Sequence, residues 1–457
     1  MTLPRPKLTL TKCLDGLNLT YIFLAAILFF ALAGGVFTNH TFEKQRREAR
    51  LMYCDFAKYY VCGKIALGPD RQKAYDARLQ ADYLVRYAFG DEKQAEEFIH
   101  YPPMDFPLMA PLATLPIEEC FLAFLLIGAA TFTTGTFLLS RAGAKAGAGF
   151  NSINAIVFFW LAVFGSVPML RAFALGQTSL FLTGITAIYL FAMLKDRPFL
   201  AGLSLALTSI KPQYSVFLVM PALAQKRYKI IFAAAICELI MLGAAAATIG
   251  FSNIINYPQI VLHAEQTSNL AGGFTSEMVN VRGLLAIVLA DNIAVKIAAV
   301  VAACTWLYLG FLWWKFARPS TTASSSASPA KVSPHKIALL LSITVLYCLT
   351  FSPHTHLYDC LILSVCAPSV GQSTLRASLA GLEHWSAKLL SLMLILYPAA
   401  GWIFLFMPGP GGSFRTAPFA IYNLILCATA TLALYNPGKL EPPPGESATL
   451  DARGEWL

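Results

Sequence analysis

The feature that most constrains this chain is a succession of long apolar runs that continues almost from end to end. Only 13% of the 457 residues are charged, whereas 57% are hydrophobic. That is about half the usual charged fraction of a soluble globular domain. A water-soluble chain of this length needs far more charge to cover its surface, so we expect the apolar excess to face lipid. The sequence therefore predicts an all-α polytopic membrane protein, folded as one continuous helical bundle.

The apolar runs predict roughly twelve transmembrane segments. The first, residues 17–38, follows a basic start and is longer than the apolar region of a cleaved signal peptide, so we interpret it as an uncleaved anchor. The later candidates are residues 117–139, 150–167, 178–194, 198–210, 212–225, 230–250, 293–315, 336–351, 357–371, 387–406 and 417–435. Together they predict a single transmembrane domain over residues 1–436.

Basic clusters in alternate loops predict the orientation. They include Arg141 and Lys145, Lys195 and Arg197, Lys226 to Lys229, Lys315 and Arg318, and Arg376 and Lys388. The positive-inside rule places these loops and both termini in the cytoplasm. The Ser/Ala-rich linker 318–334 and the Pro/Gly-rich tail 437–457, predicted to be disordered, are then cytoplasmic. The loops 40–116, 168–177, 252–292, 352–356 and 407–416 face the other side, the first being the longest.

Residues 198–225 admit two interpretations. Each half is short for a full span, which favours one kinked helix. Basic clusters flank both ends, however, and a single crossing puts one of them on the wrong side. We therefore favour a hairpin that turns at Lys211 and Pro212.

Several other classes of function are disfavoured. The net charge of +9 suggests nucleic acid, but the basic residues lie in short clusters between apolar runs, as topology signals do. Most cysteines lie inside apolar stretches and do not predict disulfides; Cys54 and Cys62 share a loop, but a bond between them is not favoured. His354 and His356 have the spacing of a metal chelate, yet no third ligand is placed by spacing, so no metal is predicted.

The polar side chains that interrupt the apolar pattern lie in, or border, loops on the predicted non-cytoplasmic side. They are Asp55 and Tyr59 after the first span, Tyr101 before the second, Arg171 and Gln177 near the fourth, Lys211 at the hairpin, Arg282 before the eighth, and His354, His356 and Asp359 between the ninth and tenth. Taken singly, Lys211 and Arg282 are also explained by snorkelling, and the histidines by a solvated turn. One site at one membrane interface explains the whole set better.

An ordered set of short motifs carries a family resemblance. Asp-Phe-x-x-Tyr-Tyr from Asp55, Ala-Tyr-Asp (74–76), Tyr-Pro-Pro (101–103) and Pro-Leu-Ala-x-Leu-Pro (111–116) come first. Leu-Gly-Gln (175–177), Leu-Ala-Gly-Leu (200–203), Lys-Pro-Gln (211–213) and Tyr-Asp (358–359) follow. The set resembles the signatures of glycosyltransferase family 87 over about residues 50–370.

The resemblance implies a GT-C-like helical bundle with a long first extracytoplasmic loop. It implies transfer of a hexose, with mannose the commonest, from a polyprenyl-phosphate donor to a lipid or glycan acceptor, with inversion at the anomeric carbon. The family's catalytic aspartate matches Asp55. The implied location is the bacterial inner membrane, among membrane lipids, with the active site on the extracytoplasmic face, and no cofactor is implied.

The chemistry of such a transfer fits the residues. One carboxylate is enough to act as general base on the attacking hydroxyl. The leaving phosphate gathers negative charge, and Lys211, Arg171 and Arg282 are the cations expected near it. Tyr59, Tyr101, Gln177, His354, His356 and Asp359 are further candidate substrate-binding residues.

Two other classes of function remain as alternatives. A transporter or flippase of lipid-linked or small polar substrates would also show spans interrupted by Lys-Pro and a buried charge. Against it, the two halves of the chain show no internal repeat, and the polar residues gather at one face. A structural subunit without chemistry is the third interpretation, which the carboxylates and aromatic residues of the long loop disfavour.

Overall fold

The computed structural model describes residues 55–88, 99–145, 153–268, 278–317, 334–366, 389–390, 393–394, 397 and 412–435. Within these residues the secondary structure is helical, and extended pairing is limited to an isolated bridge between Met278 and His356. The predictions for the first span 17–38, for Cys54, for the tail 437–457, and for nearly all of the linker 318–334 and the segment 387–406 lie outside the described residues.

Four helices in the described part are long and apolar enough to cross a membrane. They are Ile117–Ala142 within α6 (Ile117–Lys145), α13 (Tyr228–Ile249), α16 (Asp291–Phe316) and Ala417–Tyr435 within α20 (Gly412–Tyr435). Each matches a predicted span. Large apolar side chains such as Phe232, Leu239 and Val300 are exposed on these helices, as expected of surfaces that face lipid. The remaining predicted spans are not confirmed as crossings.

The other helices are shorter. They are α7 (Ile153–Phe164), α8 (Val167–Leu175), α9 (Ser179–Leu194), α10 (Pro198–Leu207), α11 (Pro212–Leu218), α12 (Met220–Ala224), α14 (Phe251–Ser268), α15 (Val281–Val288) and α17 (Pro334–Phe351), with a 3₁₀ helix, η8, at Leu357–Val365. Our expectation of a loop at 168–177 was wrong, because most of these residues form the helix α8. Ser166 caps this helix by accepting a hydrogen bond from the Met169 amide at 3.5 Å. The expected loop 252–292 likewise contains α14 and α15.

The structure resolves the ambiguity at residues 198–225 in favour of the hairpin. Lys211, between α10 and α11, pairs with Asp359, which also bonds to Ser179 at the start of α9. Beyond α12, Arg227 donates a hydrogen bond to the Met193 carbonyl oxygen at 2.9 Å, near the end of α9. From the end of α9, the chain therefore runs back through α10 to the start of α9. It then returns through α11 and α12 to the end of α9.

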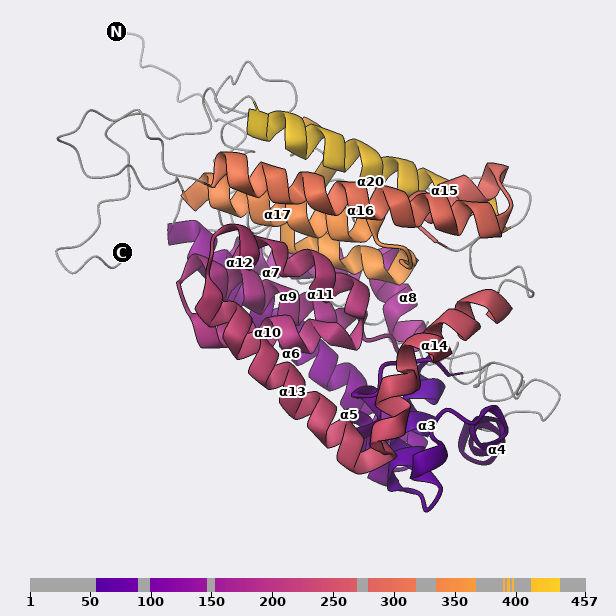
Figure 1. The fold of residues 1–457 in the computed structure, drawn as a ribbon. Coiled ribbons are helices and arrows are strands. Elements are labelled where there is room, and N and C mark those ends of the chain that lie inside the picture. The colour runs from indigo at the N-terminus through magenta and orange to yellow at the C-terminus, as the bar shows by residue number, and fades with distance from the viewer. Residues whose placement is uncertain are drawn as a thin grey trace, which may run out of the picture.

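The segment predicted as the long first loop folds into its own small unit. It comprises α3 (Asp55–Leu67), α4 (Ala77–Ala88), α5 (Asp105–Met109) and two single 3₁₀ turns. Apolar side chains between α3, α4 and α5 form two local clusters, including Val61, Leu84 and Phe106, all fully buried or nearly so. In Figure 1 this unit lies beside α14 at the end of α13.

The main core lies around α9, α10 and α17. Its largest fully buried side chains are Trp313, Tyr189 and Tyr214. The Trp313 indole donates a hydrogen bond to Thr344 at 2.9 Å, which satisfies its polar atom. Figure 1 shows α16, α17 and α20 side by side on one flank of this core, with α6, α9, α10 and α13 on the other. The site described below lies where this core meets the α3–α5 unit.

Helices α6 and α9 pack backbone to backbone at two glycines. A Cβ on Gly184 would lie 2.4 Å from the Thr131 backbone, and one on Gly135 would lie 2.2 Å from the Gly184 carbonyl oxygen. We therefore expect Gly184→Ala to force the helices apart and to destabilise the protein by about 1–3 kcal/mol. Gly243→Ala in α13 is the matched control, since its added methyl group meets nothing within 4 Å and alanine favours helix. Thermal unfolding in detergent measures both; equal melting temperatures would contradict the close packing.

Candidate active site

Asp55 is the first residue of α3, and its carboxylate is held by side chains from three parts of the chain. Gln177 Nε2 donates a hydrogen bond to Oδ2, and the Tyr101 hydroxyl donates one to Oδ1 at 3.4 Å. The Lys58 ammonium lies 3.7 Å from Oδ1. The Asp55 side chain remains 21% exposed, so the protein orients it and leaves it accessible to a ligand. Three of the predicted site residues are thus brought together.

Two tyrosines form one wall beside this carboxylate. The rings of Tyr59 and Tyr101 stack with their centroids 4.2 Å apart. The Tyr59 hydroxyl shares a hydrogen bond of 3.3 Å with Thr178 Oγ1. Burial raises the pKa of both hydroxyls well above the usual tyrosine value, and the charges of Asp105 near Tyr59 and Asp55 near Tyr101 raise it further. Both hydroxyls therefore stay protonated and able to donate.

The predicted Leu-Gly-Gln motif has a clear structural reason. Gly176 ends α8 in the left-handed region, with φ at 60°, which glycine adopts without strain. A Cβ on Gly176 would also lie 2.3 Å from the Phe56 Cβ. Glycine thus allows the chain to turn against α3, and this turn carries Gln177 to Asp55.

Three consecutive residues at the start of α9 connect the two halves of the site. Gln177 binds Asp55, Thr178 binds Tyr59, and Ser179 donates a hydrogen bond to Asp359 Oδ1 at 3.0 Å. Sequence reasoning found Gln177 but missed Thr178 and Ser179. The available signal was the run of polar side chains directly after Gly176, in an otherwise apolar segment.

Lys211 and Asp359 form a buried ion pair. Lys211 Nζ lies 2.5 Å from Asp359 Oδ1, and the two side chains are 13% and 1% exposed. The ammonium also lies 4.8 Å from the centre of the Tyr358 ring, in a cation–π contact. Snorkelling is therefore the wrong explanation for Lys211, because its charge is held inside the protein beside the site.

The two predicted histidines lie in the loop just before Asp359, next to this pair. His356 and His354 approach each other at their Nε2 atoms, 3.1 Å apart. The His356 amide donates a hydrogen bond to Asp359 Oδ2 at 3.0 Å, and Gln213 donates one to the His354 carbonyl oxygen at 3.1 Å. The loop is thus anchored to the same carboxylate that holds Lys211.

Within the described residues, no hydrogen bond or ion pair joins the two predicted arginines to Asp55, Lys211 or Asp359. Arg282, in the first turn of α15, is buried and forms an ion pair with Asp291 at 3.4 Å. Arg171 is exposed on α8, and within the described part of the chain it makes no hydrogen bond or ion pair. The contribution of either arginine to phosphate binding stays a prediction.

Asp105 is a further carboxyl that sequence reasoning missed. It begins α5, directly after the Tyr-Pro-Pro motif, and only 3% of its surface is exposed. Burial raises the pKa of this carboxyl well above its usual value, and the positive charge of Lys211 opposes the increase. The available signal was a lone carboxyl between the apolar residues Met104 and Phe106, close to the Tyr-Pro-Pro motif.

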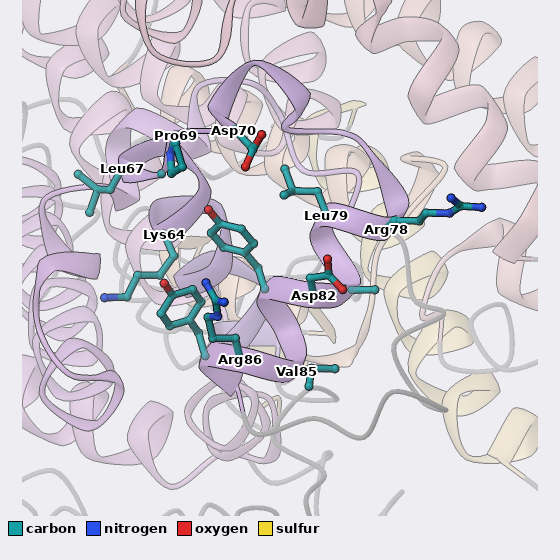
Figure 2. A pocket seen from close by; sticks show the side chains of 13 residues that line it. Lys64, Leu67, Pro69, Asp70, Arg78, Leu79, Asp82, Val85 and Arg86 are labelled. Atoms are coloured by element: carbon teal, nitrogen blue, oxygen red, sulfur yellow. The ribbon is translucent and has the colours of Figure 1, made fainter.

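A separate open depression of about 1130 Å³ lies between α3 and α4. Figure 2 shows Lys64, Arg78, Asp82 and Arg86 around it. These charged residues come from the last turn of α3 and from α4, so the depression lies beyond the far end of α3 from Asp55. We therefore place the candidate site at the Asp55, Lys211 and Asp359 cluster.

Comparison with known protein families gives a match over more than half of the chain. The model of the family described as "Glycosyltransferase family 87" matches residues 98–353. The comparison with curated proteins gives no match. Tyr101, Gln177 and Lys211 lie within the matched range, whereas Asp55 and Asp359 lie outside it. The assignment of Asp55 as a site residue therefore rests on its contacts with Gln177 and Tyr101.

Proposed function

Because the chain belongs to glycosyltransferase family 87, we propose that it transfers a hexose, mannose in the first instance, from a polyprenyl-phosphate donor to a lipid or glycan acceptor. We place this reaction on the extracytoplasmic face of a bacterial inner membrane. The observation that carries the proposal is the oriented, partly exposed Asp55 carboxylate beside the buried Lys211 and Asp359 pair. This arrangement supplies an acceptor of protons and a fixed positive charge in one site.

In the proposed reaction, an acceptor hydroxyl attacks the anomeric carbon of the donor sugar. Asp55 takes the proton of that hydroxyl while the new bond to carbon forms. The bond between the anomeric carbon and the phosphate oxygen breaks, and its electron pair leaves with the polyprenyl phosphate. Attack from the face opposite the phosphate inverts the configuration. Gln177 and Tyr101 orient Asp55 for this role.

Lys211 is proposed to stabilise the leaving phosphate. One side of its ammonium is held by Asp359, which fixes the position of the charge. An ammonium carries three N–H donors, so others remain for a phosphate oxygen. A charge placed before the reaction needs no reorganisation as the phosphate becomes more negative. The exposed apolar helices let the polyprenyl tail remain in lipid while its head group enters the site.

The family assignment favours an enzyme over the transporter alternative. The two functions are separated by incubating the purified protein with polyprenyl-phosphate mannose and an envelope lipid extract. An enzyme is expected to release polyprenyl phosphate in step with the appearance of a mannosylated product. Intact donor after prolonged incubation, with the same result for polyprenyl-phosphate arabinofuranose, would contradict the proposal.

The proposed orientation predicts which loops a reagent outside the cell can reach. Ser326→Cys lies in the linker expected in the cytoplasm, and Ala77→Cys lies at the exposed start of α4. We expect a membrane-impermeant maleimide to label Ala77→Cys in intact cells and to label Ser326→Cys only after permeabilisation. The same labelling of the unsubstituted protein gives the contribution of its native cysteines. The reverse pattern would place the site on the cytoplasmic face.

A further inference from the structure

Asp105 is the first residue of α5, in the small unit that meets the main core at the site. Its charge interacts with Tyr59 and Lys211, two residues of the site, and with Tyr75 and Tyr257. One of its oxygens, Oδ2, is fully buried without a hydrogen-bond partner, and within the described residues no hydrogen bond to the other is found. A buried carboxyl without a partner costs free energy of folding, so its presence calls for a compensating role.

Among the described residues, the three tyrosine hydroxyls and the ammonium that interact with Asp105 bond to other partners. The Tyr59 hydroxyl bonds to Thr178, the Tyr75 hydroxyl donates to the Tyr101 carbonyl oxygen at 2.6 Å, and the Tyr257 hydroxyl donates to the His100 carbonyl oxygen at 3.3 Å. The Lys211 ammonium is bonded to Asp359, not to Asp105. Within the described residues, these donors thus leave the carboxyl unbonded, as expected of a group that binds a ligand.

We propose that Asp105 binds a hydroxyl group of the sugar that is transferred. This inference rests on the proposed function and names a residue that recognises the donor. Lys211, the proposed phosphate ligand, is the cation that acts on Asp105, so a sugar attached to that phosphate comes within reach of the carboxyl. Burial favours the neutral acid, which both donates and accepts hydrogen bonds, as a sugar hydroxyl does.

The proposal predicts that removing the Asp105 carboxyl weakens binding of the sugar without lowering the stability of the protein. Asp105→Leu removes an unpaired buried polar group and keeps a similar branched shape, so the variant should melt at the same or a higher temperature than the wild type. Its affinity for the sugar should nevertheless fall. Asp105→Asn keeps a neutral group that donates and accepts, so it should retain most of the affinity.

The test compares two ligands that differ only in the sugar. Binding of polyprenyl-phosphate mannose and of polyprenyl phosphate is measured for the purified wild type, Asp105→Leu and Asp105→Asn. We expect Asp105→Leu to weaken binding of the mannosylated lipid at least about tenfold, the effect of one buried hydrogen bond, and to leave polyprenyl phosphate unaffected. Asp82→Asn is the control, because this exposed carboxyl on α4 lies outside the site.

Three results would overturn the inference. Equal losses for both lipids would indicate contact with the phosphate or a general disturbance of the site. Unchanged binding of both, with a raised KM for the acceptor, would place Asp105 on the acceptor side. A lower melting temperature or failure to fold for Asp105→Leu would indicate a structural role. If the wild type itself bound neither lipid, the proposed function would be contradicted along with this inference.

Discussion

Asp55→Asn is expected to reduce the turnover of sugar transfer by at least about a hundredfold, the usual contribution of a positioned general base. In asparagine the amide oxygen can accept the hydrogen bond of Gln177, and the amide nitrogen can donate one to the Tyr101 hydroxyl. The fold and substrate binding should therefore survive. The loss should therefore appear in kcat, with little change in KM. The measurement is the initial rate of polyprenyl phosphate release at saturating donor.

The matched control for Asp55 is Asp82→Asn. Asp82 is an exposed carboxylate on α4, in the same part of the fold but outside the site. It should leave turnover and melting temperature unchanged, as surface substitutions usually do. Turnover of Asp55→Asn within a few-fold of wild type would remove Asp55 from the mechanism, whatever the control shows.

Lys211→Ala is expected to have two large effects, because the lysine both pairs with Asp359 and is proposed to bind phosphate. Leaving the Asp359 carboxylate buried without its cation should destabilise the protein by roughly 3–5 kcal/mol. Losing the charge beside the leaving group should cost about 2–4 kcal/mol of transition-state free energy. Lys211→Arg should retain part of the activity, since the charge survives although its geometry changes.

A double variant separates these two effects. Lys211→Met combined with Asp359→Asn removes both charges. The amide oxygen of the asparagine can still accept from the His356 amide, and its amide nitrogen can donate to the Ser179 hydroxyl. We expect melting temperature to recover substantially while activity stays low. If activity returned together with stability, Lys211 would be only the partner of Asp359, and the phosphate would have to be bound by another cation, such as Arg171.

The sequence predicted the parts of the fold that depend on length and apolarity. The helices α6, α13, α16 and α20 were found because a long apolar run facing lipid has few alternatives to helix. The helix α8 was missed, because Pro168 and Arg171 in a short segment are equally typical of a loop. The helix α14 was missed because Asn253, Pro258 and Gln259 interrupt its apolar residues, so no long apolar run marks it.

The site was predictable only in part. Asp55, Tyr101 and Gln177 were grouped correctly because each interrupts an apolar pattern on the same predicted side of the membrane. The pairing of Lys211 with Asp359, 148 positions apart in sequence, depends on how α9, η8 and the hairpin pack, and no periodicity encodes that. The lack of a hydrogen-bond partner for Asp105 Oδ2 among the described residues likewise depends on where the nearby donors point. The sequence does not encode that locally.

The central claim is a direct, inverting transfer with Asp55 as base. The most direct test is the anomeric configuration of the product, determined by NMR after the purified protein has used polyprenyl-phosphate mannose of one defined configuration. The account predicts the opposite configuration in the product, released in equal amount with polyprenyl phosphate. A product with the configuration of the donor would require a second displacement through a covalent intermediate, and would contradict the role given to Asp55.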